Sequence, residues 1–285
     1  MASLAIIGLG LIGGSIAAGL KKNNSGHAIM AWDRNRESLE HGLAAGLIDM
    51  SLENPVEIDA EVVVLALPVR ALEESLPRID FGDSIITDVG SVKGHVLDTF
   101  KKVMGAVPEK FVPGHPIAGS EQHGVAAADP DLFVGHRVIL TPLADTDKTA
   151  TSKVAGMWQE LGATVSFMTP QHHDQILAQT SHLPHLLAYA LVDTLSWGGD
   201  SLEVFQYAAG GFRDFSRIAA SDPVMWRDIF LSNAEPIVEV LDRYGEEVAS
   251  LRQLIIEGDG VQLEAIFARA KVARDYFSEI TQPDD

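Results

Sequence analysis

The chain has 285 residues, with 21 Lys and Arg against 40 Asp and Glu, and a formal net charge of −19. This length suits about two domains, and the 46% of apolar residues is enough to give each a hydrophobic core. So acidic a chain repels phosphates, which excludes nucleic acid and anionic membranes as partners. The same charge argues at first against a substrate that carries several carboxylates.

The chain contains no cysteine, which excludes disulfides, thiolate zinc sites, iron–sulfur clusters and a cysteine nucleophile. Its most membrane-like stretch, Leu4–Leu20, is 17 residues long and holds five glycines, so it is too short and too glycine-rich for a transmembrane helix. The N-terminus also lacks the basic start and the cleavage site of a signal peptide. These features predict a soluble, cytoplasmic protein.

The first half of the chain alternates short apolar runs with helix-length segments. That alternation predicts an α/β fold with a doubly wound, mainly parallel sheet. We expect strands at 4–7, 28–32, 62–67, 84–87, 111–112, 138–141 and 164–168. We expect helices between several of them at 12–22, 37–45, 93–104 and 148–161.

No further strand is expected after Pro170. Asp222 and Pro223 form a helix start, with a capping carboxylate before a proline at the first helical position. We place a domain boundary near Thr169, between an α/β domain at 1–169 and an all-α domain at 170–285. Apolar residues recur at helical spacing within 171–196, 223–244, 246–257 and 261–280.

A glycine-rich turn, Gly8-Leu9-Gly10-Leu11-Ile12-Gly13, follows the first strand and opens the first helix. Gly8 allows a tight turn, Gly10 lets the backbone approach a pyrophosphate, and Gly13 allows the helix to pack closely on the strand. The helix N-terminus supplies amide donors and a positive dipole to the phosphates. With Asp33 lying 20 residues after Gly13, this context favours a dinucleotide site over an ordinary glycine-rich turn.

Asp33 stands where a carboxylate would bind a ribose 2′-hydroxyl, and it favours NAD because it would repel the 2′-phosphate of NADP. Arg34 and Arg36 follow directly and could clamp such a phosphate, although a solvated loop is the simpler interpretation of these arginines. We therefore predict NAD, with NADP as the alternative. The candidate cofactor-binding residues are Gly8, Gly10, Leu11, Ile12, Gly13, Asp33, Arg34, Pro68 and Ser91.

Three further segments hold polar residues at a density that no fold requires: 88–94, 114–121 and 181–185. The first two follow predicted strands, at the carboxyl ends where open α/β sheets bind ligands. The third lies in the first long helix of the second domain.

Together with the glycine turn and the segment 210–217, these segments resemble the prephenate/arogenate (cyclohexadienyl) dehydrogenase family of tyrosine biosynthesis. The match runs from Leu4 to about Ile229, and the segments Gly-His-Pro-Ile-Ala-Gly-Ser-Glu (114–121) and Ser-His-Leu-Pro-His (181–185) are its most specific parts. The resemblance implies a Rossmann domain, a helical second domain that makes a homodimer, and NAD(P)-dependent oxidative decarboxylation. In that reaction a C4 hydride passes to nicotinamide and CO2 leaves, giving 4-hydroxyphenylpyruvate from prephenate or tyrosine from arogenate.

His115 is the expected partner of the substrate's hydroxyl proton, because a neutral imidazole accepts that hydrogen bond near physiological pH. The alternative is a structural histidine at a strand end, and its place between Gly114 and Pro116 favours the catalytic interpretation. The resemblance implies that Ser91 bonds both the histidine and the substrate hydroxyl.

The substrate's carboxylates need cations or directed donors, and Arg217 is the best candidate because a guanidinium binds a carboxylate through two hydrogen bonds. Asp214 would orient Arg217 or neutralise it, and a surface salt bridge is the alternative for the arginine. Trp226 would wall the pocket or belong to the core. The other candidate substrate-binding residues are Ser181, His182 and His185, with both histidines on one helix face, and Ser120 and Glu121.

Ten histidines, among them the pair at 172 and 173, make a metal site an alternative. No His-Glu-x-x-His pattern occurs, and hydride transfer to nicotinamide needs no metal, so we predict none. Two other functions remain as alternatives: a two-domain NAD-dependent dehydrogenase of a 3-hydroxy acid, and a non-catalytic nucleotide-sensing protein. The first leaves the segment 181–185 unexplained, and the second has no need for His115, Ser91 and Arg217 together.

The resemblance also weakens the objection to a substrate with two carboxylates. Net charge acts at long range and is screened beyond about 8 Å at physiological salt. We expect Arg217, Arg213, Lys93 and the amides of the glycine turn to concentrate positive potential in the cleft.

Overall fold

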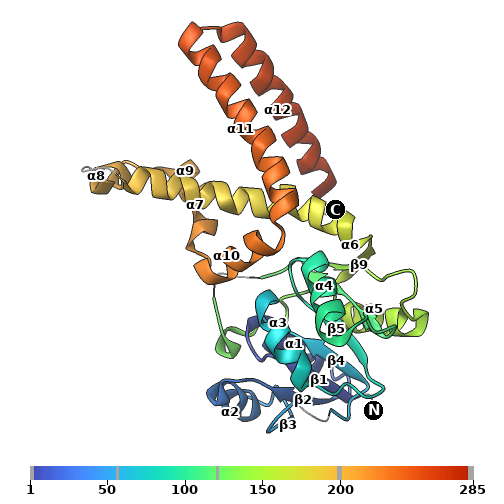
Figure 1. Ribbon diagram of the computed structural model, residues 1–285. Helices are drawn as coiled ribbons and strands as arrows, with labels where there is room; N and C mark the ends of the chain where they lie inside the picture. The colour runs from blue at the N-terminus through green and yellow to red at the C-terminus, as the bar shows by residue number, and fades with distance from the viewer. Residues whose placement is uncertain (1–2, 56–57, 120–121, 198–200, 282–285) are drawn as a thin grey trace. The chain divides into compact units, whose positions relative to one another are not determined.

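The computed structural model describes residues 3–55, 58–119, 122–197 and 201–281 (Figure 1). Its contacts group into two compact units, Met1–Ile237 and Val238–Asp285. Within the described residues, no helix has both the length and the apolar character needed to cross a bilayer.

A six-stranded parallel sheet lies at the centre of the first unit, in the strand order β3-β2-β1-β4-β5-β6. The order reverses between β1 and β4, so the carboxyl ends of these two strands form the topological switch point where such sheets bind ligands. The doubly wound parallel sheet is therefore confirmed. Its strands are β1 (Ser3–Ile7), β2 (Ala28–Trp32), β3 (Met50–Ser51), β4 (Val62–Leu65), β5 (Ile85–Asp88) and β6 (Phe111–Val112).

Helices cover both faces of this sheet because successive side chains of each strand point to opposite sides. Leu4 and Ile6 of β1 lie in a core that they share with α1 and α5. Ala5 and Ile7 lie in a second core, shared with α3 and α4. The helices of this part are α1 (Leu11–Lys22), α2 (Arg36–Ala44), α3 (Leu72–Ser75), α4 (Lys93–Met104) and α5 (Lys148–Glu160).

A second, three-stranded sheet contains a strand that the sequence did not predict. β7 (Gly114–Pro116) pairs antiparallel with β8 (Arg137–Leu140), and β8 pairs parallel with β9 (Thr164–Phe167). β7 is an edge strand of this sheet, which is where a proline without an N–H is tolerated. The pairing places His115 opposite Ile139 and so determines the position of its backbone.

Among the described residues, no strand follows β9. Helix α6 (Pro170–Leu177) begins after Thr169, whose side chain accepts a hydrogen bond from the backbone N–H of His172. The further helical elements are a π-helical turn η4 (Ala178–His182), α7 (Leu183–Ser196), α8 (Ser201–Gln206), α9 (Gly210–Ser216), η5 (Arg217–Ala220), α10 (Pro223–Ser232), α11 (Ala234–Glu257) and α12 (Gly260–Thr281).

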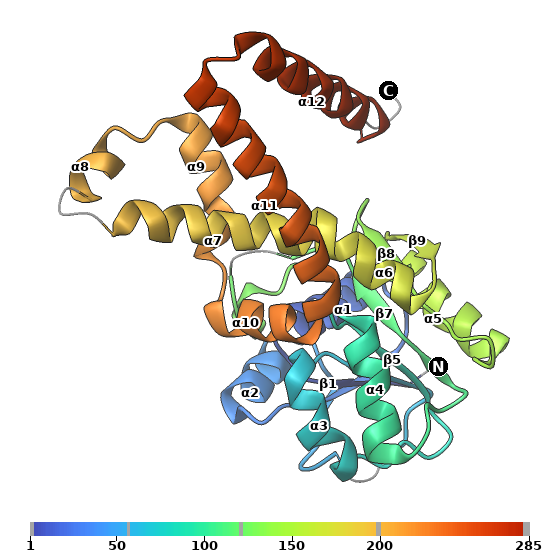
Figure 2. The ribbon, with the colours of Figure 1, turned by 45° about the horizontal axis from the view of Figure 1, so that its top comes forward.

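The helical run expected over 171–196 is continuous, with η4 as a π-helical turn inside it. Two other predicted helices have wrong boundaries. The helix expected over 223–244 ends at Ser232, before Asn233, whose amide bonds two other groups of the protein. Conversely, α11 continues through Gly245, since one glycine costs a long helix only about 1 kcal/mol. In the second unit, α11 ends at Glu257, Gly258 follows with φ +70°, and α12 begins at Gly260 (Figure 2).

Candidate active site

The glycine turn between β1 and α1 has the geometry of a dinucleotide site. A Cβ at Gly8, where φ is +100°, would lie 2.4 Å from the Ala66 carbonyl oxygen, and a Cβ at Gly13 would lie 2.1 Å from that of Gly8. By contrast, apart from Gly10 and its two chain neighbours, no atom of the described residues lies within 4 Å of the Cβ position of Gly10, so a pyrophosphate can approach the backbone there. Within the described part of the chain no side chain caps α1, which leaves the N–H groups of its first turn, at Leu11 and Ile12, for a phosphate.

Asp33 lies just past β2, and hydrogen bonds hold its carboxylate in one orientation. Oδ2 accepts the N–H of Leu9 at 2.7 Å, and Oδ1 accepts that of Asn35 at 2.7 Å. Each oxygen can accept a further hydrogen bond, as ribose hydroxyls require. Arg34 beside it is exposed. Pro68 is also exposed and follows β4 at the start of the turn η1 (Val69–Ala71), so the residues on both sides of the switch point fit NAD.

Replacing Asp33 with Ala should weaken NAD binding about 10- to 100-fold, because a charged hydrogen bond contributes about 1.5–3 kcal/mol. Titration of the protein with NAD by calorimetry measures the dissociation constant directly. Asp83→Ala is the matched control, since Asp83 is an exposed carboxylate at the opposite edge of the sheet. An unchanged dissociation constant for Asp33→Ala would remove the carboxylate from the cofactor site.

A buried ion pair organises the polar segment that follows β5. Lys93 is 0% exposed, and its Nζ donates to Asp88 Oδ2 and to the carbonyl oxygen of Gly114, both at 2.5 Å. Asp88 also accepts the N–H of Gly90 at 2.8 Å and that of Gly114 at 3.1 Å. The pair therefore joins the end of β5, the start of α4 and the start of β7, directly before His115.

The expectation that Lys93 adds positive potential to a substrate cleft is wrong. Its ammonium group is fully enclosed and neutralised by Asp88, so it acts inside the protein. Burial lowers the pKa of Lys93, and the charge of Asp88 opposes that shift.

His115, half-buried on β7, contacts a residue that was not predicted to belong to the site. Its Nδ1 lies 2.9 Å from Nε2 of His173, whose own Nδ1 lies 2.7 Å from Oδ1 of Asp174. Burial, followed by the nearby His173, Lys93 and His182, lowers the pKa of His115 well below its ordinary value. His115 is therefore neutral at physiological pH, as an acceptor of a hydroxyl proton must be.

The sequence contains a weak signal for His173, which was expected only as part of a possible metal site. His173 lies four residues before the buried Leu177, on the inner face of α6, whereas His172 is exposed. Within the part of the chain that the structure describes, no three His, Cys, Asp or Glu side chains gather as a metal site.

Ser91, also half-buried, lies in the loop between β5 and α4. The hydrogen bond that the resemblance implied between Ser91 and His115 is not among those of the described residues, where His173 is the partner of the His115 ring. The role of Ser91 toward a substrate hydroxyl stays a prediction. Ser120 and Glu121 lie outside the described residues.

The segment 181–185 lies over Trp226 of α10. The ring of His185 stacks on the indole with 3.7 Å between centroids, and the His182 ring meets it edge-on at 6.1 Å. Both histidines thus share a helix face, as predicted. His185 Nδ1 donates to the carbonyl oxygen of Ser181 at 2.8 Å.

His182 and Trp226 are both largely buried, but their polar atoms differ. His182 is 1% exposed, its Nδ1 lies 3.1 Å from the Asn233 amide nitrogen, and burial lowers its pKa to about 4. Trp226 is 6% exposed, and its indole N–H has no hydrogen-bond partner among the described residues. The His182 ring is therefore bound by Asn233 inside the protein, whereas the Trp226 N–H can still donate a hydrogen bond to another group.

Arg217, at the start of η5, is exposed. The turn η5 packs against α7, the helix that carries His185. Burial lowers the pKa of His185, the hydrogen bond to the Ser181 carbonyl opposes that shift, and the positive charge of Arg217 adds to it. Asp214 is exposed on α9, one turn before Arg217. The structure thus brings a cation to the same side as the His185–Trp226 pair.

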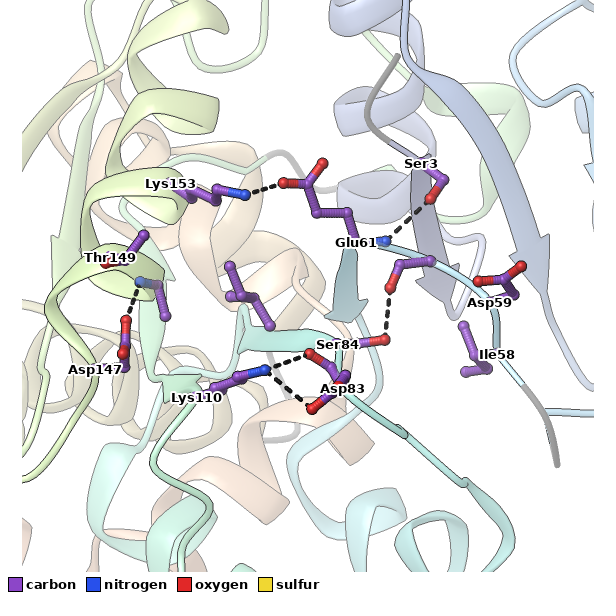
Figure 3. A pocket seen from close by; sticks show the side chains of 13 residues that line it. Ser3, Ile58, Asp59, Glu61, Asp83, Ser84, Lys110, Asp147, Thr149 and Lys153 are labelled. Carbon is purple, nitrogen blue, oxygen red and sulfur yellow. Dashed lines mark hydrogen bonds and ion pairs between the residues drawn. The ribbon is translucent and has the colours of Figure 1, made fainter.

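A separate hollow of about 640 Å³ lies at the amino edge of the main sheet (Figure 3). The glycine turn and Asp33 lie at the opposite, carboxyl edge. Its charged side chains include two ion pairs, Lys153 with Glu61 and Lys110 with Asp83. None of the candidate site residues lines it. Because these lysines already have partners and the switch point is at the other edge, this hollow is not the active site.

A dinucleotide turn at the switch point, with a neutral histidine held at the same edge of the protein, defines an NAD-dependent oxidoreductase. Two family models match consecutive parts of the chain: "Prephenate dehydrogenase, nucleotide-binding domain" over residues 16–167 and "Prephenate dehydrogenase, dimerization domain" over residues 169–269. The chain belongs to the prephenate dehydrogenase family.

Individual relatives agree over nearly the whole chain. The cyclohexadienyl dehydrogenase of Zymomonas mobilis is 37% identical over 280 residues, which are 95% of this chain and 94% of that protein. The prephenate dehydrogenase of Bacillus subtilis is also 37% identical, over 96% of this chain and 75% of its own length. The predicted family is therefore confirmed.

Solved structures show the same fold. The Aquifex aeolicus prephenate dehydrogenase, in complex with hydroxyphenyl propionate and NAD+, has a TM-score of 0.89 and 35% identity, covering 97% of this chain and 98% of that one. The Synechocystis arogenate dehydrogenase has a TM-score of 0.79 and 28% identity, covering 96% and 99%. These comparisons confirm the Rossmann-type fold and NAD as the cofactor.

Proposed function

We propose that this chain catalyses the NAD-dependent oxidative decarboxylation of prephenate, arogenate or both, in tyrosine biosynthesis. The observation that carries this proposal is the neutral His115, held just past the carboxyl end of β6, at the edge of the main sheet that also carries the glycine turn. A hydroxyl proton must leave as a carbinol carbon is oxidised, and a neutral imidazole is the group that accepts it.

Each nearby side chain has a role in this proposal. His115 takes the proton of the substrate hydroxyl, and Ser91 orients that hydroxyl. Bound NAD supplies the acceptor for the C4 hydride, and the ring becomes aromatic as its carboxylate leaves as CO2. The binding residues for the phosphates and ribose are those of the glycine turn and Asp33, described above.

On the helical side, we assign the binding of a substrate carboxylate to Arg217, whose guanidinium can donate two parallel hydrogen bonds. Trp226 and His185 form a flat aromatic surface, 3.7 Å between ring centroids, against which a six-membered ring can pack. The remaining assignments, Ser181, His182, Asp214, Ser120 and Glu121, rest on the resemblance.

The domain assignment and the assembly also belong to this proposal. We assign 1–169 to the cofactor and 170–285 to substrate binding and dimerisation, so that the active protein is a homodimer in the cytoplasm. The name of the family model over 169–269 supports the dimer, and a chain without cysteine suits a reducing compartment. Sedimentation of the purified protein measures the oligomeric state.

Initial rates with prephenate and with arogenate, each with NAD and with NADP, test the function. We expect reduced nicotinamide and CO2 in equal amounts, and higher rates with NAD than with NADP, because of Asp33. If neither substrate yields reduced nicotinamide with either cofactor, the proposed function is wrong.

Replacing Arg217 with Ala should mainly raise KM, because the substrate loses a charged hydrogen-bond partner worth about 1.5–3 kcal/mol, or roughly 10- to 100-fold. Steady-state rates over a range of substrate concentrations separate KM from kcat. Arg78→Ala, which removes an exposed arginine from the turn that precedes β5, at the amino edge of the main sheet, is the matched control. If Arg217→Ala leaves KM unchanged, this arginine does not bind the substrate and its role is structural.

A further inference from the structure

We infer that His173 and Asp174 are positioning residues that hold His115 in one tautomer, with its proton on Nδ1 and the lone pair of Nε2 available to the substrate. This inference rests on the proposed role of His115 as the proton acceptor. It follows from three side chains joined in series by hydrogen bonds, Asp174, His173 and His115, in which each group determines the protonation of the next.

The series of hydrogen bonds begins at Asp174, whose carboxylate is bound by the first turn of α4. Its Oδ1 accepts the backbone N–H of Lys93 at 2.9 Å, and its Oδ2 accepts that of Gly94 at 2.7 Å. Three hydrogen bonds to the charged form, from these amides and His173, lower the pKa of Asp174 in spite of its burial. Helix α6 carries Asp174 to this end of α4 (Figure 2), and the carboxylate is ionised, so it acts only as an acceptor.

The next group is His173, which is 0% exposed. Because Asp174 Oδ1 can only accept, the His173 Nδ1 at 2.7 Å must carry the proton of that hydrogen bond. Burial lowers the pKa of His173, and Asp174 opposes the shift; the ring is therefore neutral. A neutral imidazole with its proton on Nδ1 has a lone pair on Nε2, so that atom is an acceptor.

The third group is His115, whose Nδ1 lies 2.9 Å from that acceptor nitrogen. Two nitrogens at this distance need one proton between them, and since His173 Nε2 is the acceptor, His115 Nδ1 is the donor. Neutral His115 therefore has no proton on Nε2. When it takes the substrate proton there, both its nitrogens become donors, and Nδ1–H still points to an acceptor backed by a carboxylate.

The charges around the pair do not reverse this assignment. Lys93 and His182 lie near His115, and Lys93 and Asp88 lie near His173. Lys93 and Asp88 neutralise one another at 2.5 Å, and His182, with a pKa of about 4, is neutral at pH 7. Asp174 is thus the anion that orients the two histidine rings.

The test is nitrogen NMR of the full-length protein labelled with 15N-histidine, with the His115 signals identified by their loss in His115→Asn. The shifts of the two ring nitrogens report which one bears the proton. At pH 7.5 we expect a protonated Nδ1 and an unprotonated Nε2 for His115. A proton on Nε2 of His115 in the wild-type protein would overturn the inference.

Two variants separate positioning from mere structural support. In His173→Gln the amide oxygen can replace Nε2 as the acceptor, so kcat should stay within a few-fold of wild type. In His173→Leu no acceptor remains, and kcat should fall by a factor on the order of 10² or more, with KM and NAD affinity little changed. Equal losses in both variants, or a loss confined to KM, would contradict the positioning role.

His172→Leu is the matched control, because it makes the same change at the adjacent, exposed position of α6; its kcat should equal that of wild type. The NMR result does not depend on turnover. Should the wild type be inactive with prephenate and arogenate while His115 keeps the expected tautomer, the proposed function fails and the tautomer assignment stands.

Discussion

His115→Asn should lower turnover by a factor on the order of 10² or more while leaving the affinity for NAD unchanged. In the proposed function the imidazole accepts the hydroxyl proton, so without it the carbinol must be oxidised with no base beside it. The asparagine amide is short and polar, and it can still donate toward His173 from the position of Nδ1. The fold should therefore persist.

The measurement pairs initial rates of reduced nicotinamide formation with titration of the same protein by NAD. His136→Asn, at an exposed histidine preceding β8, controls for the loss of an imidazole elsewhere. Turnover that survives the His115 change would exclude this histidine as the proton acceptor. A parallel loss of NAD binding would show instead that His115 supports the cofactor site.

Lys93→Met should destabilise the protein by about 3–5 kcal/mol, since it leaves the buried carboxylate of Asp88 without its cation. Lys93 is 0% exposed and Asp88 is 1% exposed, so water cannot replace the lost ammonium group. The methionine side chain fills a similar volume, so the expected loss is electrostatic rather than a cavity. The carbonyl of Gly114, just before His115, would also lose its donor.

Urea denaturation at a fixed protein concentration measures the free energy of unfolding. Lys102→Met, on the same helix, removes a lysine from an exposed pair with Glu73, and its transition should stay close to wild type. The double variant Lys93→Met/Asp88→Asn should recover part of the loss, because the unpaired charge is removed. If Lys93→Met is as stable as Lys102→Met, the buried pair contributes nothing to the free energy of unfolding.

The main sheet and the cofactor turn could be predicted because their causes are local in the sequence. An apolar run buried on both faces is itself the signal of a parallel strand, and β2 and β6 lie within the predicted bounds. The turn at Gly8 needs a positive φ, which glycine adopts without strain. Such features depend on a few consecutive residues, so one sequence is enough to find them.

The errors have a common cause in contacts between distant parts of the chain. Asn233 ends α10 because its amide bonds Asp174 and His182, more than fifty residues away. The short strand β7 forms because β8 offers it an edge. Neither propensity nor periodicity contains this information.

The sequence by itself determined the fold class, the dinucleotide turn, the cofactor and the histidine that we propose as the proton acceptor, because these depend on motifs with short spacing. Only the tertiary structure decided what surrounds that histidine. It showed that Lys93 is enclosed with Asp88 and that His173 of α6, itself bonded to Asp174, contacts His115 from 58 residues further along the chain. The physical reason is that an imidazole's tautomer and pKa depend on burial and on partners in space, and the net charge of −19 carries no information about either.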